Sequence, residues 1–164
     1  MVDGLNTEKA TRYAYRILAA RPLSVKEFRT KLRRKGYDGS VVEAVTERFQ
    51  ELGYLNDADI ARQLARTFAM SKLWGDRRIA ITLKTKGFDR ELIEAALALA
   101  RQELTERAAV RQLLERKGKG HPVVPENNLE KRRLLQSLMG KGFPPGLIFE
   151  VLALSGEETG DDGE

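Results

Sequence analysis

The stretch KLRRKGYDGSVVEAV, residues 31–45, recurs as TLKTKGFDRELIEAAL at 82–97 and as SLMGKGFPPGLIFEVL at 137–152. Each copy places a Lys-Gly-aromatic step between a preceding leucine and a following pair of apolar residues. The glycines of the three steps are spaced by 51 and then 55 residues. A pattern that recurs in register at about fifty residues predicts a repeat protein built from three similar modules.

Each copy has the features of a helix end, a sharp turn and a new helix start. Glycine adopts the left-handed conformation that closes many helices without steric cost. Asp38 and Asp89 then occupy positions suited to a helix N-cap, and Pro145 suits a first helical turn. The aromatic residue before the cap is placed to staple onto the next helix. We interpret the step as a structural joint without chemistry of its own.

Hydrophobic periodicity and cap residues predict three helices in each module. The stretch 90–117 has no Gly or Pro and could form one long helix, but Thr105 as a cap favours two. No segment keeps the period of a strand, so the predicted fold class is all-α, in an elongated array that is straight or curved. The expected helices cover about 7–20, 39–51, 75–86 and 145–154, and others open after Ser24, Asn56, Asp89 and Asn127.

We place the modules at 1–52, 53–103 and 104–155, followed by an acidic tail at 156–164. Each module is near the lower size limit for burying a stable core alone, so we expect neighbouring modules to pack on one another. The tail has no base, and its composition predicts disorder. It either serves solubility or folds back on the basic body of the chain.

The composition excludes several kinds of site. The chain has no Cys and one His, which leaves no disulfide scaffold, thiolate zinc site or cysteine nucleophile and suits a reducing compartment. No apolar run approaches the roughly 20 residues of a membrane span, and the N-terminus lacks the apolar core of a signal peptide. We therefore expect a cytoplasmic protein without a metal or organic cofactor.

No catalytic constellation stands out among the polar residues. His121 is alone in a loop. Asp57 and Asp59 resemble a metal-binding pair, but they fall in a first helical turn, where acids are favoured anyway. The stretch 118–120, Gly-Lys-Gly, lacks the spacing of a phosphate-binding P-loop. The sequence thus predicts a binding protein and not an enzyme.

The informative polar signal is positive charge at repeated positions. Five of the 24 acids lie in the tail, so the 29 bases of residues 1–155 face only 19 acids. One aligned column of the second helices is basic in all three modules, and another is basic in the first two. These positions share one flank of the helix, beside the apolar stripe. The predicted contacts are Lys26, Arg77 and Arg132 in the first column, Arg33 and Lys84 in the second, and Arg29 between them.

Trp74 is the only tryptophan, and it directly precedes the second helix of module 2. It either packs between helices or stands exposed as an anchor for a partner, because tryptophan is enriched at interface hot spots.

Several of these stretches resemble the RecX family, bacterial regulators of the RecA recombinase. The resemblance rests on Leu-Gly-Tyr-Leu-Asn-Asp-Ala at 52–58, on the turn Lys-Gly-Phe-Asp-x-x-Leu-Ile at 86–93 and on Ala-Arg-Pro-Leu-Ser at 20–24. With the three spaced turns, it covers about 10–154.

The resemblance implies a non-enzymatic regulator that lies in the helical groove of the RecA nucleoprotein filament. Such a protein bridges neighbouring protomers and inhibits recombinase, ATPase and coprotease activities. The implied partners are the RecA filament and, weakly and non-specifically, single- or double-stranded DNA, with no membrane. We expect a monomer.

The alternative is a tandem helix-turn-helix nucleic-acid-binding protein without a RecA partner. Such a protein would begin its recognition helices with base-reading residues such as Arg, Asn and Gln. The helices after the three turns begin Gly-Ser-Val-Val, Arg-Glu-Leu-Ile and Pro-Gly-Leu-Ile, which are poor base readers. The residues leave open whether the basic flank meets phosphate or protein.

Overall fold

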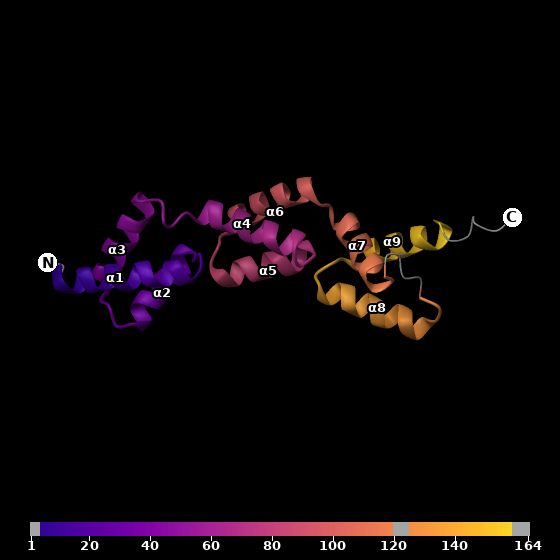
Figure 1. Ribbon diagram of the computed structural model, residues 1–164, viewed down its shortest axis with the longest axis horizontal. Helices are drawn as coiled ribbons and strands as arrows, with labels where there is room; N and C mark the ends of the chain where they lie inside the picture. Colours follow the sequence, from indigo (N-terminus) through magenta and orange to yellow (C-terminus); the bar gives the residue numbers. More distant parts are fainter. Residues whose placement is uncertain (1–3, 120–124, 159–164) are drawn as a thin grey trace.

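A computed structural model describes residues 4–119 and 125–158 of the 164-residue chain, and within them it has nine α-helices and no strand. The helices follow one another from the N-terminal to the C-terminal end of an elongated array (Figure 1). They are α1 (Gly4–Ala20), α2 (Val25–Arg34), α3 (Gly39–Glu51), α4 (Asp57–Met70), α5 (Asp76–Lys86), α6 (Arg90–Glu103), α7 (Glu106–Lys117), α8 (Asn128–Gly140) and α9 (Pro145–Glu158).

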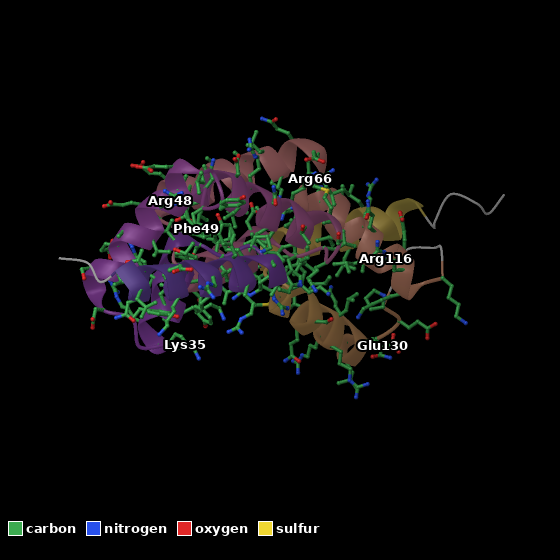
Figure 2. All side chains as sticks on the ribbon, turned by 60° about the vertical axis from the view of Figure 1, so that its left-hand side comes forward. Lys35, Arg48, Phe49, Arg66, Arg116 and Glu130 are labelled. Carbon is green, nitrogen blue, oxygen red and sulfur yellow. The ribbon has the colours of Figure 1, made fainter. Side chains whose placement is uncertain are left out.

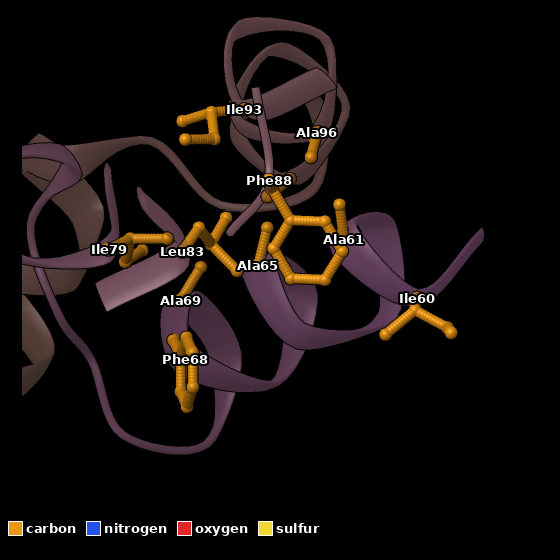
Figure 3. Close-up of a cluster of buried hydrophobic side chains, with 11 residues drawn as sticks. Ile60, Ala61, Ala65, Phe68, Ala69, Ile79, Leu83, Phe88, Ile93 and Ala96 are labelled. Carbon is orange, nitrogen blue, oxygen red and sulfur yellow. The ribbon is translucent and has the colours of Figure 1, made fainter. Parts of the chain in front are cut away.

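The array divides into three modules with one apolar core each: α1–α3, α4–α6 and α7–α9. In module 1 the ring centroids of Phe28 and Phe49 are 5.5 Å apart and the rings are tilted by 36°. Figure 2 shows Phe49 inside, while charged side chains such as Arg48 project outward. In module 2 the Phe88 ring lies against Ala61 and Ala65 of α4 (Figure 3). The predicted all-α fold of three tandem modules is confirmed.

The helix starts follow the predicted caps. Ser24 and Glu27 form a complete capping box at α2, and the side chains of Asn56 and Asp89 accept hydrogen bonds from the third residue after each cap. Thr105 does the same at α7, so 90–117 is two helices, as the cap predicted. Asp38 occupies the cap position of α3, but its side chain makes no cap hydrogen bond.

The three turn glycines adopt the left-handed conformation that the sequence predicted. Their φ values are +97° at Gly36, +96° at Gly87 and +99° at Gly142, a region that side-chain-bearing residues avoid. The near-identity of these values shows that the three Lys-Gly-aromatic steps have one backbone geometry.

Two helix ends differ from the prediction. Helix α1 begins at Gly4, three residues early, and α9 continues to Glu158. The first three residues of the predicted disordered tail are therefore helical. The packed apolar face of α9 stabilises the helix, and no proline follows to end it before Glu158. The rest of the tail lies outside the described residues, as does His121. Among the helices described, none is long and apolar enough to cross a membrane.

Candidate interaction surface

The second helices of the modules, α2, α5 and α8, stand end to end along the array (Figure 1). The Ser24 hydroxyl, at the N-cap of α2, donates a hydrogen bond to the Lys86 carbonyl at the end of α5. One module further on, the Gly75 amide at the start of α5 donates to the Lys141 carbonyl at the end of α8, at 2.8 Å. Each N-terminus thus meets the C-terminus of the next second helix, and the helix dipoles point the same way.

A carboxylate from the following module closes each junction. Asp57 accepts a hydrogen bond from the Val25 amide at 2.9 Å, and Glu106 accepts one from the Asp76 amide at 2.8 Å. Both amides are the first of their helices, where they have no partner within the helix. Burial raises the pKa of Asp57 and of Glu106, although these amide hydrogen bonds oppose the rise. This contact between modules was not predicted, because the sequence indicates for Asp57 only a place in a first helical turn.

The first predicted basic column lies along this row of second helices. Lys26, Arg77 and Arg132 are exposed; the first two are the second residues of their helices, and Arg132 is the fifth residue of α8. In the part of the chain that the structure describes, no carboxylate lies within ion-pair distance of any of the three. The methylene stem of Lys26 packs over Gly87 of module 2. The column therefore presents three free charges that run along the array.

The other three predicted contact residues differ from one another in their surroundings. Arg29 and Arg33 both pair with Glu43 of α3, at 2.6 and 3.3 Å, and Arg29 is half-buried with its Nε atom unpaired. These two arginines already join α2 to α3, so one of their two charges is offset inside the module. Lys84 is exposed on the rim of an apolar hollow of about 400 Å³ between α5 and α6. A contact role for the three residues stays a prediction.

A basic cleft at the junction of modules 1 and 2 was not predicted as a unit. It lies between α2 and the end of α5, and five bases line it together with Glu27. Burial raises the pKa of Glu27, but hydrogen bonds from Arg21 and the Ser24 amide and the charge of Lys86 outweigh it and lower the pKa overall. The run Lys-Leu-Arg-Arg-Lys at 31–35 was the available signal. The five bases are Arg21, Lys26, Lys31, Arg34 and Lys86.

Trp74 packs on module 2. Its ring stacks on Phe68 at 4.7 Å, and the guanidinium of Arg78 lies 4.0 Å from the ring centroid. Arg101 donates to the Trp74 carbonyl at 2.8 Å and pairs with Asp76 at 2.7 Å. The packing alternative is therefore confirmed, and an anchor role for the half-buried ring stays a prediction.

The two acids that resembled a metal-binding pair, Asp57 and Asp59, are used in structural contacts. Asp59 pairs with Arg62, and its amide is capped by Asn56. Across residues 4–119 and 125–158, no group of three or more His, Cys, Asp and Glu residues could hold a metal ion. The site that the geometry offers is thus a long basic surface for binding.

The fold and this surface define an all-α repeat protein with a basic row of second helices. Family models for the first, second and third three-helix domains of RecX match residues 10–49, 56–97 and 105–152. The chain belongs to the RecX family, which confirms the resemblance found in its sequence.

Individual relatives agree with this assignment. "Regulatory protein RecX" of Mycolicibacterium smegmatis is 31% identical over 150 residues, which cover 90% of this chain and 79% of that protein. The protein of the same name from Deinococcus radiodurans is 37% identical over 145 residues, or 88% and 67%. The crystal structure of RecX from Lactobacillus salivarius matches with a TM-score of 0.75 over 91% of this chain and 97% of that one. At 22% identity, that match shows the shared fold.

Proposed function

We propose that this chain is a regulator that binds the RecA nucleoprotein filament in its helical groove. It bridges neighbouring RecA protomers as a monomer, without catalysis or a cofactor, and inhibits the recombinase, ATPase and coprotease activities. The observation that carries the proposal is the end-to-end row of second helices with free charges at Lys26, Arg77 and Arg132. Family membership supports RecA as the partner, because the relatives described above carry the name regulatory protein RecX.

The length of the row suits a filament better than a single compact target. Helices α2, α5 and α8 have 10, 11 and 13 residues. At a rise of 1.5 Å per residue, an end-to-end row of this size extends over about 50 Å. Three weak contacts on successive subunits then act with an avidity that no single contact provides. Because the contacts are charged, we expect the affinity to fall as salt rises.

The test is ATP hydrolysis by RecA on single-stranded DNA with and without this protein. We expect inhibition at well below one chain per RecA, because each chain bridges several protomers. Reversing the column, with Lys26→Glu, Arg77→Glu and Arg132→Glu, should weaken inhibition while circular dichroism shows unchanged helix content.

A matched control reverses three other exposed bases, with Arg48→Glu, Arg111→Glu and Arg116→Glu. Its net charge equals that of the column variant, so non-specific electrostatics would affect both alike. Equal loss of inhibition in the two variants would contradict a specific role for the column. No inhibition by the parent protein together with tight binding to naked DNA would favour the tandem helix-turn-helix alternative.

A further inference from the structure

A second basic surface lies on module 1, away from the junctions. It is an open hollow of about 450 Å³ between α1 and the turn that follows α2. The lining consists of four bases and two tyrosines and contains no acid: Lys9, Arg12, Arg16, Lys35, Tyr13 and Tyr37. Arg12 pairs with Glu8 on the exposed side of α1 at 2.5 Å. Among the described residues, the other three bases have no carboxylate within ion-pair distance.

The two tyrosines form an aromatic floor with cations around it. Their ring centroids are 6.2 Å apart at an interplanar angle of 46°. The guanidinium of Arg16 lies 5.2 Å from the Tyr13 centroid, and the Lys35 ammonium lies 5.9 Å from it. Both rings are half-buried and pack on the core of module 1, which fixes their position. The hollow thus combines a π surface held in place with positive charges on long side chains.

Module 2 shows that the fold does not require these residues. The buried Ala10 and Ala14 of α1 correspond to the buried Ala61 and Ala65 of α4, 51 positions on. In this register the counterparts of the four α1 residues carry no charge and no aromatic ring. Lys9, Arg12, Tyr13 and Arg16 correspond to Ile60, Gln63, Leu64 and Thr67. A three-helix module can therefore be built without a basic aromatic face on its first helix.

Of the three Lys-Gly-aromatic turns, the hollow uses the one that no other module covers among the described residues. An added Cβ atom would collide with Lys26 of module 1 at Gly87, and with Arg78 of module 2 at Gly142. At Gly36 it would meet no atom within 4 Å. The Lys-Gly-Tyr step of module 1 thus lies at the free end of the row, where a ligand can reach Lys35 and Tyr37.

We propose that this hollow binds single-stranded nucleic acid. Lys9, Arg16 and Lys35 pair with backbone phosphates, while an unpaired base stacks on the tyrosines, the combination that sequence-tolerant single-strand binding sites use. A duplex keeps its bases inside and cannot offer this stacking, and an acidic peptide would leave the tyrosines unused. The site is separate from the basic row of second helices. It does not rest on the RecA proposal, because naked oligonucleotides test it.

The experiment measures fluorescence anisotropy of a labelled oligo(dT) strand and of a duplex of equal length with the full chain at several salt concentrations. The variants take their residues from module 2: Tyr13→Leu, and Arg12→Gln with Arg16→Thr. Tyr13→Leu should weaken single-strand binding by about 5- to 150-fold and leave duplex binding nearly unchanged. The double arginine variant should lower the salt slope for the single strand by about 0.7, because Arg16 neutralises one phosphate whereas Arg12 is held by Glu8.

The control removes two other exposed charges, with Arg48→Gln and Arg116→Gln. Figure 2 shows Arg48 at a different edge of module 1 from Lys35, with Phe49 between them. This control should bind the oligonucleotide like the parent chain. Parent-like single-strand binding by both hollow variants would overturn the proposal, as would an equally weakened control. Displacement of oligo(dT) by poly-glutamate at equal charge concentration would also overturn it and assign the hollow to an acidic protein.

Circular dichroism checks that each variant folds. If Tyr13→Leu lowered the helix content, the double arginine variant would carry the test alone, because both arginines are exposed and contribute no core packing. An unchanged salt slope in that variant would then count against the hollow.

Discussion

The two junctions differ in the hydrogen bond that joins the ends of the second helices: main-chain atoms make it between modules 2 and 3, whereas a serine side chain makes it between modules 1 and 2. At the junction between modules 2 and 3, the Gly75 amide donates a hydrogen bond to the Lys141 carbonyl, and an added Cβ at Gly75 would overlap the carbonyl group of Gly142. At the junction between modules 1 and 2, the Ser24 hydroxyl donates this hydrogen bond in place of a backbone amide, and the Lys26 stem packs over Gly87. The ends of the second helices therefore approach each other more closely between modules 2 and 3 than between modules 1 and 2.

Leu73 adds to the difference. It precedes α5 in module 2, yet it is fully buried in the core of module 3. Its φ of +50° is unusual for a residue with a side chain, and burial of the leucyl group offsets that strain. The aligned residue of module 1 is Pro22, which is exposed. The junction between modules 2 and 3 is therefore packed more closely than the junction between modules 1 and 2.

Among the substitutions that probe the two junctions, Leu73→Ala should lower the free energy of unfolding most. Removing a fully buried leucine leaves a cavity, and we expect the free energy of unfolding of module 3 to fall by about 3–5 kcal/mol. Because a repeat array is stabilised by neighbour contacts, urea unfolding followed by circular dichroism should separate into two transitions. Pro22→Ala, the matched change at the other junction, should cost under about 1 kcal/mol. Similar costs for the two changes would refute the difference in closeness.

The turn glycines give a finer test, because their φ values are nearly equal. Gly36→Ala has no neighbour to disturb and should cost about 1–2 kcal/mol through backbone strain alone. Gly142→Ala places a Cβ 2.6 Å from the Arg78 amide nitrogen, so it should cost about 1–3 kcal/mol more. Gly87→Ala should fall between them, since the outer Lys26 stem can move aside but its Cβ, 2.6 Å from the added atom, is fixed to the backbone. Denaturation midpoints of the three variants measure the order, and equal costs would mean that the junctions contribute no steric constraint.

The sequence predicted what depends on local spacing. Caps such as Asn56 and Asp89, the three left-handed glycines and the apolar columns follow from rules that act within a few residues. The basic column was found for the same reason, since alignment of the repeats fixes which side chains share a flank. Its binding role remains a prediction.

The contacts between modules could not be predicted in this way. The bonds from the Val25 amide to Asp57 and from the Asp76 amide to Glu106 join residues 32 and 30 positions apart, and they depend on how complete modules pack. The hollow of module 1 was missed because its bases come from α1 and from a separate turn, and no single stretch of sequence displays them together.

The smallest expected effect concerns a property that the two junctions share, the half-buried carboxylates Asp57 and Glu106. Burial raises the pKa of each above its ordinary value. An acid with a raised folded-state pKa contributes stability below its unfolded pKa, near 4 to 4.5, and loses it as pH rises through the folded value. Asp57→Asn and Glu106→Gln keep an oxygen that can accept the amide hydrogen bond but remove this ionisation.

Relative to either variant, the parent chain should therefore be more stable near pH 4 than near pH 7, by less than the effects of Leu73→Ala or Gly142→Ala. Thermal melting of the parent and the two variants across this range measures the difference. Asp76 and Arg101 also face Glu106, the first raising and the second lowering its pKa, so Arg101→Met should enlarge the response at this junction alone. A parent that gained stability over the variants as pH rose would show that the amide bonds outweigh burial, and the two carboxylates would then act as stabilising caps for α2 and α5.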